Sequence, residues 1–226
     1  MKDKELFRLL VFSLFINGIV FCVNLKGYAT VSVTDFGAKG DLTPLNSVNT
    51  VSNSTTIFCA GANFVDSDVG KLVEVFNGGT WRGTSNETLL VSIAAVSSPT
   101  TIIASAPAGA TANGLHGIYA TDSTVGFSNA IANCAIPTDT ILIPSGNYLL
   151  VCSNVNASQY GGVILRRGGI TFQGEGHPTL TGTGGWRDNA NGVVERGHMF
   201  LMLSPMTNDF PLIFSNLDLD GGTSRS

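Results

Sequence analysis

Two aspartates near the end of the sequence have the spacing that shared chemistry requires. Asp218 and Asp220 alternate with Leu217 and Leu219 in a short run before two glycines. Alternate residues of a strand share one face, so leucines turned inward place both carboxylates outward, with their Cα atoms about 6.5 to 7 Å apart. A glycoside hydrolase uses such a pair, one as general acid and one to activate water or attack the sugar. The simpler alternative, which we favour, is a pair of solvated residues, because alternation alone predicts polar outward positions.

A second candidate site, for sugar binding, follows the glycine-rich run 182–185. An exposed Trp186 could stack on a sugar ring, and Arg187 could hold a uronate carboxylate through two parallel hydrogen bonds. The alternative, and the commoner arrangement, is a tryptophan folded against a neighbouring loop. Both residues are therefore candidates for substrate binding rather than for catalysis.

Residues that could serve a metal ion or an acid-base pair are scattered. Glu175 and His177 flank a glycine and could exchange protons, but a carboxylate and an imidazole at a turn are more often simply exposed. His116 and His198 stand alone in the sequence. The sequence therefore predicts no metal site and no evident cofactor.

The composition indicates a folded protein rich in strands. Glycine is abundant (27 residues), charged residues are sparse (12%) and the apolar fraction is 43%, so the chain can bury a core. The formal net charge is −4, whereas nucleic-acid recognition needs clustered Lys and Arg. We therefore expect no nucleic-acid partner.

The first 29 residues have the order of an export signal. Lys2, Lys4 and Arg8 precede a nearly uninterrupted apolar run from 9 to 25, and Gly27-Tyr28-Ala29 places small residues at the two positions that a signal peptidase reads. An uncleaved anchor is the alternative, but polar and glycine residues interrupt the run, and a spanning helix needs about 20 apolar residues. We expect residues 1–29 to be removed, which leaves a secreted or cell-surface protein without membrane contact.

The mature sequence begins with a strand and a turn, residues 30–42, and then changes character. Residues 43–120 are rich in Ser, Thr, Asn and Ala, with short β-branched runs at 71–76, 88–93 and 100–103. Asn-Gly, Gly-Gly and Ser-Pro turn signals separate these runs. The pattern predicts a small antiparallel β module inserted after the first strand.

A short helix is predicted after this module. Its apolar positions recur at helical spacing and share one face: Phe127, Ala130, Ile131 and Cys134. Asp122 or Ser123 can accept the amide hydrogens that have no partner at the start of the helix. The helix should end by Pro137.

Residues 121–226 contain, besides this helix, short strands closed by glycines. The strand pattern occurs in three segments: 140–150, 168–176 and 216–222. Aligning Leu150, Phe172 and Leu219 gives offsets of about 22 and about 47 positions, which is typical of the stacked turns of a β-solenoid. We expect three to four coils, with Phe172 in a stacked ladder near Tyr148 or Leu150.

Several of these segments resemble the rhamnogalacturonase/epimerase-like members of the pectate-lyase-like superfamily. The shared motifs are Val33-Thr34-Asp35-Phe36-Gly37-Ala38-Lys39-Gly40-Asp41, the segment 121–131, and the strand-Pro-x-Gly-x-Tyr pattern within 140–150. In that family the first two motifs are nearly adjacent, so residues 43–120 would be an insertion, and the run 64–71 resembles the start of a β-barrel-like subdomain found in such insertions. The resemblance implies an all-β fold: the N-terminal coils of a right-handed parallel β-helix, with an N-terminal capping helix and an inserted small β module.

The same resemblance implies an exported carbohydrate-active protein whose partner is an acidic, pectin-like polysaccharide, but it leaves the reaction open. A polysaccharide lyase would use a base, usually with Ca²⁺ neutralising a uronate carboxylate, whereas a glycoside hydrolase would use two carboxylates and no metal. Asp218 and Asp220 do not stand in the Asn-Thr-Asp or Asp-Asp settings of polygalacturonase-like enzymes, so no catalytic role is carried over to them. A non-catalytic surface or spike module, in which the β-helix is a rigid rod, is the alternative.

Members of the family carry further coils, and most of their catalytic carboxylates lie on those coils. This sequence stops just after a turn, at residues 223–226. We therefore expect an N-terminal fragment or a natural short product that lacks the main catalytic coils. Enzyme and non-enzyme hypotheses stay open at this point, and the sequence specifies neither the polysaccharide nor the oligomeric state.

Overall fold

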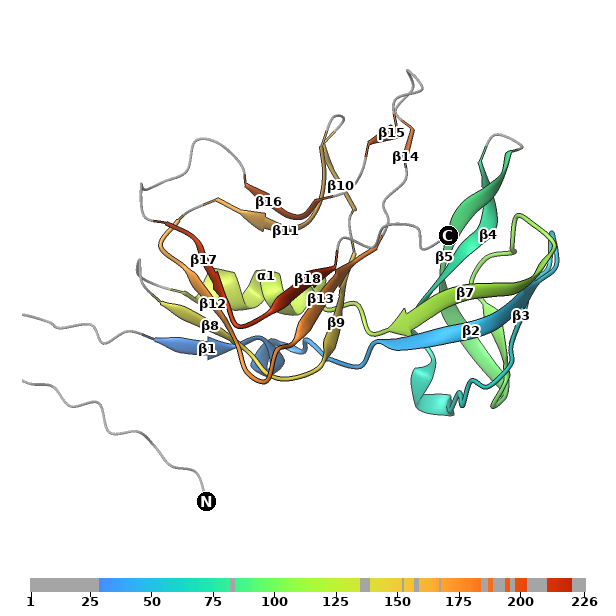
Figure 1. Ribbon diagram of the computed structural model, residues 1–226, viewed down its shortest axis with the longest axis horizontal. Coiled ribbons are helices and arrows are strands. Elements are labelled where there is room, and N and C mark those ends of the chain that lie inside the picture. Colours follow the sequence, from blue (N-terminus) through green and yellow to red (C-terminus); the bar gives the residue numbers. More distant parts are fainter. Residues whose placement is uncertain are drawn as a thin grey trace, which may run out of the picture.

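The computed structural model describes residues 29–81, 84–134, 139–151, 153–156, 159–166, 168–183, 187–188, 194–195, 198–202 and 211–220. The predicted export signal, residues 1–29, lies outside them apart from Ala29. Within the described ranges, no helix is long and apolar enough to cross a membrane. The described chain is mostly β-structure with one α-helix, and it combines parallel sheets with a small closed barrel (Figure 1).

Residues 43–120 contain the strands of the barrel, drawn at the right of Figure 1. The strands are β2 (Thr43–Thr50), β3 (Thr56–Cys59), β4 (Leu72–Trp81), β5 (Thr84–Ser98), β6 (Thr101–Ala104) and β7 (Ala112–Ala120), and a 3-10 turn, η2 (Asp66–Asp68), precedes β4. All neighbouring pairs are antiparallel, in the order β2-β3-β6-β5-β4-β7. The interior holds Val73, Val75 and Phe64, whose ring meets Tyr119 edge to face. Closure removes free sheet edges, which suits a small inserted module.

The other described strands stack mainly in parallel. The first sheet has the order β1-β8-β12-β17, formed by β1 (Thr30–Ser32), β8 (Thr140–Ile143), β12 (Thr171–Gly174) and β17 (Ile213–Ser215). The second has the order β18-β13-β9, formed by β9 (Asn147–Leu150), β13 (Thr179–Gly182) and β18 (Asp218–Asp220). In the third, β11 (Gln159–Leu165) pairs in parallel with β16 (His198–Met202) and antiparallel with β10 (Ser153–Asn156). A separate antiparallel pair joins β14 (Arg187–Asp188) and β15 (Val194–Glu195).

Apolar side chains from the parallel sheets share one interior. In the first sheet Phe172 lies between Ile141 and Phe214 in register, and the two phenylalanine rings are stacked with centroids 4.8 Å apart. In the second sheet Leu180 lies between Tyr148 and Leu219. Leu219, on the edge strand β18, is 54% exposed. Burial of these ladders stabilises the stack because each added strand removes apolar surface from water.

The prediction for Phe172 is confirmed in part: the ring stands in a stacked ladder and shares one apolar cluster with Tyr148 and Leu150, but the ladder itself is a different one. Phe172 stacks on Ile141, in the first sheet, and not in the ladder of Tyr148 and Leu150 in the second. The alignment failed because glycine-closed strands occur in both sheets: Leu150 belongs to β9, Phe172 to β12 and Leu219 to β18. Ile141 and Phe172 are neighbours in adjacent strands, so their separation in the sequence is the length of one repeat. This length exceeds the spacing of about 22 residues expected from solenoid repeats.

The predicted helix is confirmed as α1 (Thr124–Asn133). The apolar stripe is buried, and the helix packs against β1, β11 and the 3-10 turn η1 (Val33–Phe36). Asp122 accepts the Thr124 N–H at 2.9 Å, as the sequence predicts. The Ser123 hydroxyl instead accepts a hydrogen bond from the Lys39 backbone N–H and donates one to the Lys39 carbonyl, both at 3.1 Å. These bonds connect the start of the helix to the segment 33–41. Pro137 lies outside the described residues.

Candidate functional site

Two chain segments attach the barrel to the second parallel sheet. On the way into the barrel, the Leu42 N–H donates to the Asn147 carbonyl at 2.9 Å. On the way out, the Ser123 N–H donates to the Leu149 carbonyl, also at 2.9 Å. Both acceptors belong to β9, at the edge of the sheet β18-β13-β9. Strands β2, β4 and β7 of the barrel therefore lie next to the outer face of that sheet.

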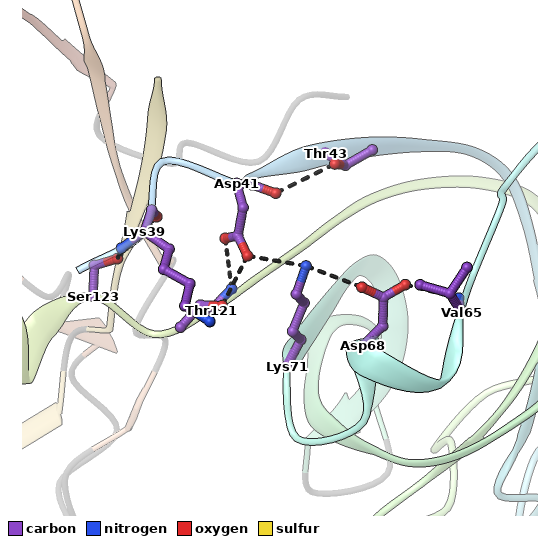
Figure 2. Close-up of polar contacts among 8 residues, drawn as sticks. All are labelled: Lys39, Asp41, Thr43, Val65, Asp68, Lys71, Thr121 and Ser123. Atoms are coloured by element: carbon purple, nitrogen blue, oxygen red, sulfur yellow. Dashed lines mark hydrogen bonds and ion pairs between the residues drawn. The ribbon is translucent and has the colours of Figure 1, made fainter. Parts of the chain in front are cut away.

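A polar network fixes these two segments to each other (Figure 2). Asp41, two residues before β2, accepts hydrogen bonds from the Thr121 N–H at 2.9 Å and from the Thr121 hydroxyl at 2.8 Å. The Lys71 ammonium lies 2.9 Å from Asp41 Oδ2 and 3.0 Å from Asp68 Oδ1. Because Thr121 directly follows β7 and Lys71 directly precedes β4, this network joins the beginning and the end of the barrel. We call Asp41, Asp68, Lys71 and Thr121 the neck clamp.

The neck clamp shifts the pKa of two of its members. Burial of Asp41 acts to raise its pKa, but hydrogen bonds from the Thr121 backbone and from the Lys71 and Thr121 side chains outweigh burial and hold the pKa below its usual value. Burial of Lys71 acts to lower its pKa, but the contacts with Asp41 and Asp68 raise it above its usual value. Both shifts favour the charged forms, so the clamp is an ion pair at neutral pH.

A cleft of about 490 Å³ lies between the barrel and the sheet β18-β13-β9. This volume falls in the range of small-molecule binding sites, about 300 to 1,000 Å³. The cleft exists because both segments of the neck run beside β9, which brings an outer barrel face to an outer sheet face. Its walls therefore consist largely of side chains that a strand on its own would turn to solvent.

The sheet wall of the cleft is a polar ladder. Leu180 of β13 is fully buried in the interior, so its neighbours Thr179 and Thr181 point to the other face. The strand register places Thr179 beside Asn147 of β9, and Thr181 beside Asp220 of β18. All four polar residues line the cleft. Stacked strands thus present hydroxyl, amide and carboxylate groups on one surface.

The barrel wall contributes an aromatic ring and an acid. Val73 and Val75 of β4 face the barrel core, so the alternate residues Glu74 and Phe76 face outward and line the cleft. Glu74 is only 1% exposed. An outward residue of a barrel is buried to this extent only when another part of the molecule covers it. Glu74 is thus a covered residue of the cleft wall.

His116 and Asn46 also line the cleft, from β7 and β2. The imidazole Nδ1 lies 3.2 Å from the Asn46 side-chain oxygen, and both side chains are exposed, so they can exchange hydrogen bonds with a ligand. The ring of Phe76 adds an apolar surface beside them. An aromatic surface next to several fixed hydroxyl and amide groups is the combination that sugar recognition uses. Among the described residues, no group of three or more His, Cys, Asp or Glu could hold a metal ion.

The residues singled out from the sequence lie in different places. Asp218 and Asp220 share the outer face of β18, but only Asp220 lines the cleft, where it is half-buried; Asp218 is exposed. Trp186 lies outside the described residues. Arg187 lies on β14, opposite Glu195 of β15. Of the two aspartates, the geometry thus brings Asp220 into the cleft.

Sequence reasoning missed the barrel wall. Glu175 and His177 are both exposed at the turn after β12, whereas the apparently isolated His116 lines the cleft. Phe76 carried a signal that could have been used, because it stands on the outward phase of a strand whose inward residues are valines. Its outward aromatic ring breaks the alternation of apolar inward and polar outward residues that a half-buried strand shows.

Comparison with known proteins gives little further information. No family model and no curated protein matches the sequence. Among solved structures, the chain is similar to the tailspike protein gp49 from Pseudomonas phage LKA1, with 19% identity, a TM-score of 0.27, and coverage of 63% of this chain and 23% of that one. It is also similar to the Gp54 tailspike of Acinetobacter baumannii bacteriophage AP22, in complex with A. baumannii capsular saccharide, with 10% identity, a TM-score of 0.27, and coverage of 84% and 39%. The chain thus spans well under half of either protein, and such scores assign it neither a fold nor a function.

Proposed function

We propose that this protein is an exported polysaccharide-binding module, built on the N-terminal coils of a right-handed parallel β-helix with a barrel inserted in the first coil. The observation that carries the proposal is the cleft, which combines the Phe76 ring with the polar ladder of Thr179, Thr181 and Asp220. A parallel stack repeats equivalent outward positions from strand to strand. It therefore offers a row of similar groups to a polymer of similar units.

The parallel stack and the neck clamp both order the cleft before a ligand binds. The stack supplies a rigid support, and the clamp fixes the barrel wall at a set distance from the sheet wall. Binding through weak polar contacts is favoured when both walls are ordered in advance, because less conformational entropy is lost on association. This arrangement suits a surface or spike module. Recovery of Thr30 as the first residue of the exported protein would support export, and recovery of Met1 on a membrane-bound product would contradict it.

Hydrolysis of the bound polysaccharide is the second candidate, because two carboxylates, Glu74 and Asp220, line the same cleft. One carboxylic acid would protonate the glycosidic oxygen while the other carboxylate activates water. A lyase reaction has less support, because none of the described residues lining the cleft is a Lys or Arg that could remove a proton. An assay of new reducing ends decides: product that disappears in Glu74→Gln and Asp220→Asn supports hydrolysis, and no product from the unchanged protein excludes it.

Binding is tested by affinity electrophoresis of the full chain in gels that contain individual polysaccharides. We expect retardation by at least one polysaccharide and its loss in Phe76→Ala. The matched control is Phe58→Ala, because Phe58 is a barrel phenylalanine on β3, 42% exposed, that does not line the cleft. Equal retardation of both variants would place binding elsewhere, and no retardation by any polysaccharide would reject the proposed function.

A further inference from the structure

The turn that joins β2 to β3 contains an Asn-x-Thr triplet, Asn53-Ser54-Thr55, whose middle residue is not proline. In exported proteins this pattern is the acceptor for N-linked oligosaccharides, and the asparagine must lie on the surface of the folded product. Two further triplets of this kind begin at Asn86 and Asn156, whose side chains are not among those that the structure describes. The geometry of the acceptor can therefore be read in full at the first triplet.

The Asn53 side chain is open to solvent on a fixed backbone. It is exposed, and within the described part of the chain its amide makes no hydrogen bond. The backbone φ is 62°, a left-handed conformation that asparagine adopts more readily than most residues. The Asn53 N–H donates to the Ala108 carbonyl at 2.9 Å, and the Ser54 N–H donates to the Val51 carbonyl at 3.0 Å. The side-chain amide can thus carry a large substituent without breaking a contact of the fold.

This turn lies at the end of the barrel away from the neck (Figure 1). Strand β2 begins at Thr43, two residues after Asp41 of the neck clamp, and ends at Thr50. At about 3.3 Å per residue, the strand separates Asn53 from the neck by more than about 20 Å. Asn53 is also not among the described residues that line the cleft. A substituent on Asn53 would therefore leave the cleft open.

We propose that Asn53 of the exported protein carries an N-linked oligosaccharide. In the transfer, Asn53 Nδ2 attacks the anomeric carbon of a lipid-linked oligosaccharide diphosphate and loses a proton, while the bond from that carbon to the diphosphate breaks and the lipid diphosphate leaves. The Thr55 hydroxyl completes the triplet that the transferase recognises. Val51, which is 56% exposed beside the acceptor, would be shielded by the hydrophilic substituent. The inference rests on the export in the proposed function, because the transfer takes place on exported chains.

The experiment is peptide mapping by mass spectrometry of the full protein as its own source produces it. We expect the exported protein to yield an Asn53 peptide with an oligosaccharide that peptide-N-glycosidase removes, which converts Asn53 to aspartate. An unmodified Asn53 peptide, or an oligosaccharide on Asn86 or Asn156 alone, would overturn the inference and leave the proposed function standing. Retention of the chain inside the cell would overturn the proposed export and this inference together.

Two matched substitutions test the role of the triplet. Thr55→Val keeps the β-branched shape but lacks the hydroxyl, so the oligosaccharide should disappear, whereas Thr55→Ser keeps the hydroxyl and should retain it. The backbone bond from the Ala104 N–H to the Thr55 carbonyl, at 2.8 Å, is available in both variants. Retardation by polysaccharide in gels should be the same in both, because the acceptor lies outside the cleft. Loss of the oligosaccharide in both variants, or its presence on Asn53 in Thr55→Val, would overturn the assignment of this triplet.

Discussion

At the scale of single residues, the neck clamp determines how firmly the barrel is held. Lys71 contacts two carboxylates, and its ammonium lies 5.5 Å from the centroid of the Tyr119 ring, whose side chain packs in the barrel core. Both carboxylate oxygens of Asp41 accept hydrogen bonds from Thr121. Loss of the lysine would leave two neighbouring carboxylates without a counter-charge. An uncompensated, partly buried charge destabilises more than the intact pair stabilises.

Lys71→Met should therefore lower the free energy of unfolding by about 1 to 3 kcal/mol. Methionine keeps most of the apolar stem, so the loss reports the missing charge. Urea denaturation followed by circular dichroism measures the change. Lys39→Met is the control, because the Lys39 side chain is exposed near the same neck and should change stability by less than about 0.5 kcal/mol. Similar small changes in both variants would contradict a stabilising role for the clamp.

The clamp should also make stability depend on pH at both extremes. The pKa of Asp41 is lowered by folding, so its contribution is present above its usual value of 3.8 and is lost as the pH falls through the folded value. The pKa of Lys71 is raised, so its contribution is present below 10.5 and is lost as the pH rises through the folded value. Melting temperatures of the unchanged protein and Asp41→Asn should differ at neutral pH and converge in acid. A difference that stays constant down to about pH 2 would contradict this assignment.

At the scale of elements, close backbone contacts join segments that the barrel separates in the sequence. A Cβ on Gly126 would lie 2.6 Å from the Ala38 nitrogen, so α1 rests directly on the turn after η1. A Cβ on Gly40 would lie 2.9 Å from the Gly146 Cα. Together with the bonds from Ser123 to Lys39, the Gly126 contact unites the segments 33–41 and 121–131 in space, and the Gly40 contact joins the first of them to 140–150. The barrel is thus inserted without separating them.

Gly126→Ala tests the contact between α1 and the turn after η1. Alanine favours a helix over glycine by about 1 kcal/mol, but its methyl group would meet backbone atoms that cannot rotate away. We expect a net loss of about 1 to 3 kcal/mol, measured by thermal melting. Ser128→Ala, at an exposed position of the same helix, should be neutral or slightly stabilising. An increase in melting temperature for Gly126→Ala would show that the helix moves freely and would contradict the close contact.

Local sequence patterns predicted the helix and strands well, but they did not predict which strands and side chains lie next to each other in space. Helix α1 was predictable because its apolar stripe and the capping Asp122 are neighbours in the sequence. The partner of Phe172 was not, because pairing between strands depends on the length of the turns rather than on the strand itself. The cleft was beyond a local pattern for the same reason: Phe76 and Asp220 line it together although they are far apart in the sequence. Alternation placed Asp220 on an outer face but could not show what covers that face.

At the scale of the whole molecule, the described residues form two separate apolar cores. One lies in the parallel sheets and includes Phe172 and Tyr148. The other lies inside the barrel and includes Phe64. The neck clamp and the hydrogen bonds to β9 connect the two units through polar contacts. Polar connections of this kind allow one unit to lose structure while the other keeps it.

Substitutions in the two cores should therefore act locally. Phe172→Ala removes a fully buried ring and should cost the parallel sheets about 3 to 5 kcal/mol, and Phe64→Ala should cost the barrel a similar amount. Hydrogen exchange read by mass spectrometry should show faster exchange mainly in the substituted unit. Equal acceleration in both units for both variants would mean that barrel and sheets unfold as one.

The central claim is that the cleft between the barrel and the sheet β18-β13-β9 holds a sugar. Its most direct test is NMR chemical-shift mapping of the full chain during titration with an oligosaccharide of the polysaccharide that retards the protein in gels. The account predicts concentration-dependent changes in the amide chemical shifts of Thr179, Thr181 and His116, which represent both walls of the cleft. The amide chemical shift of Val125 on α1 should not change. Shifts confined to α1 or to β3, with Thr179 and Thr181 unchanged at saturation, would contradict it.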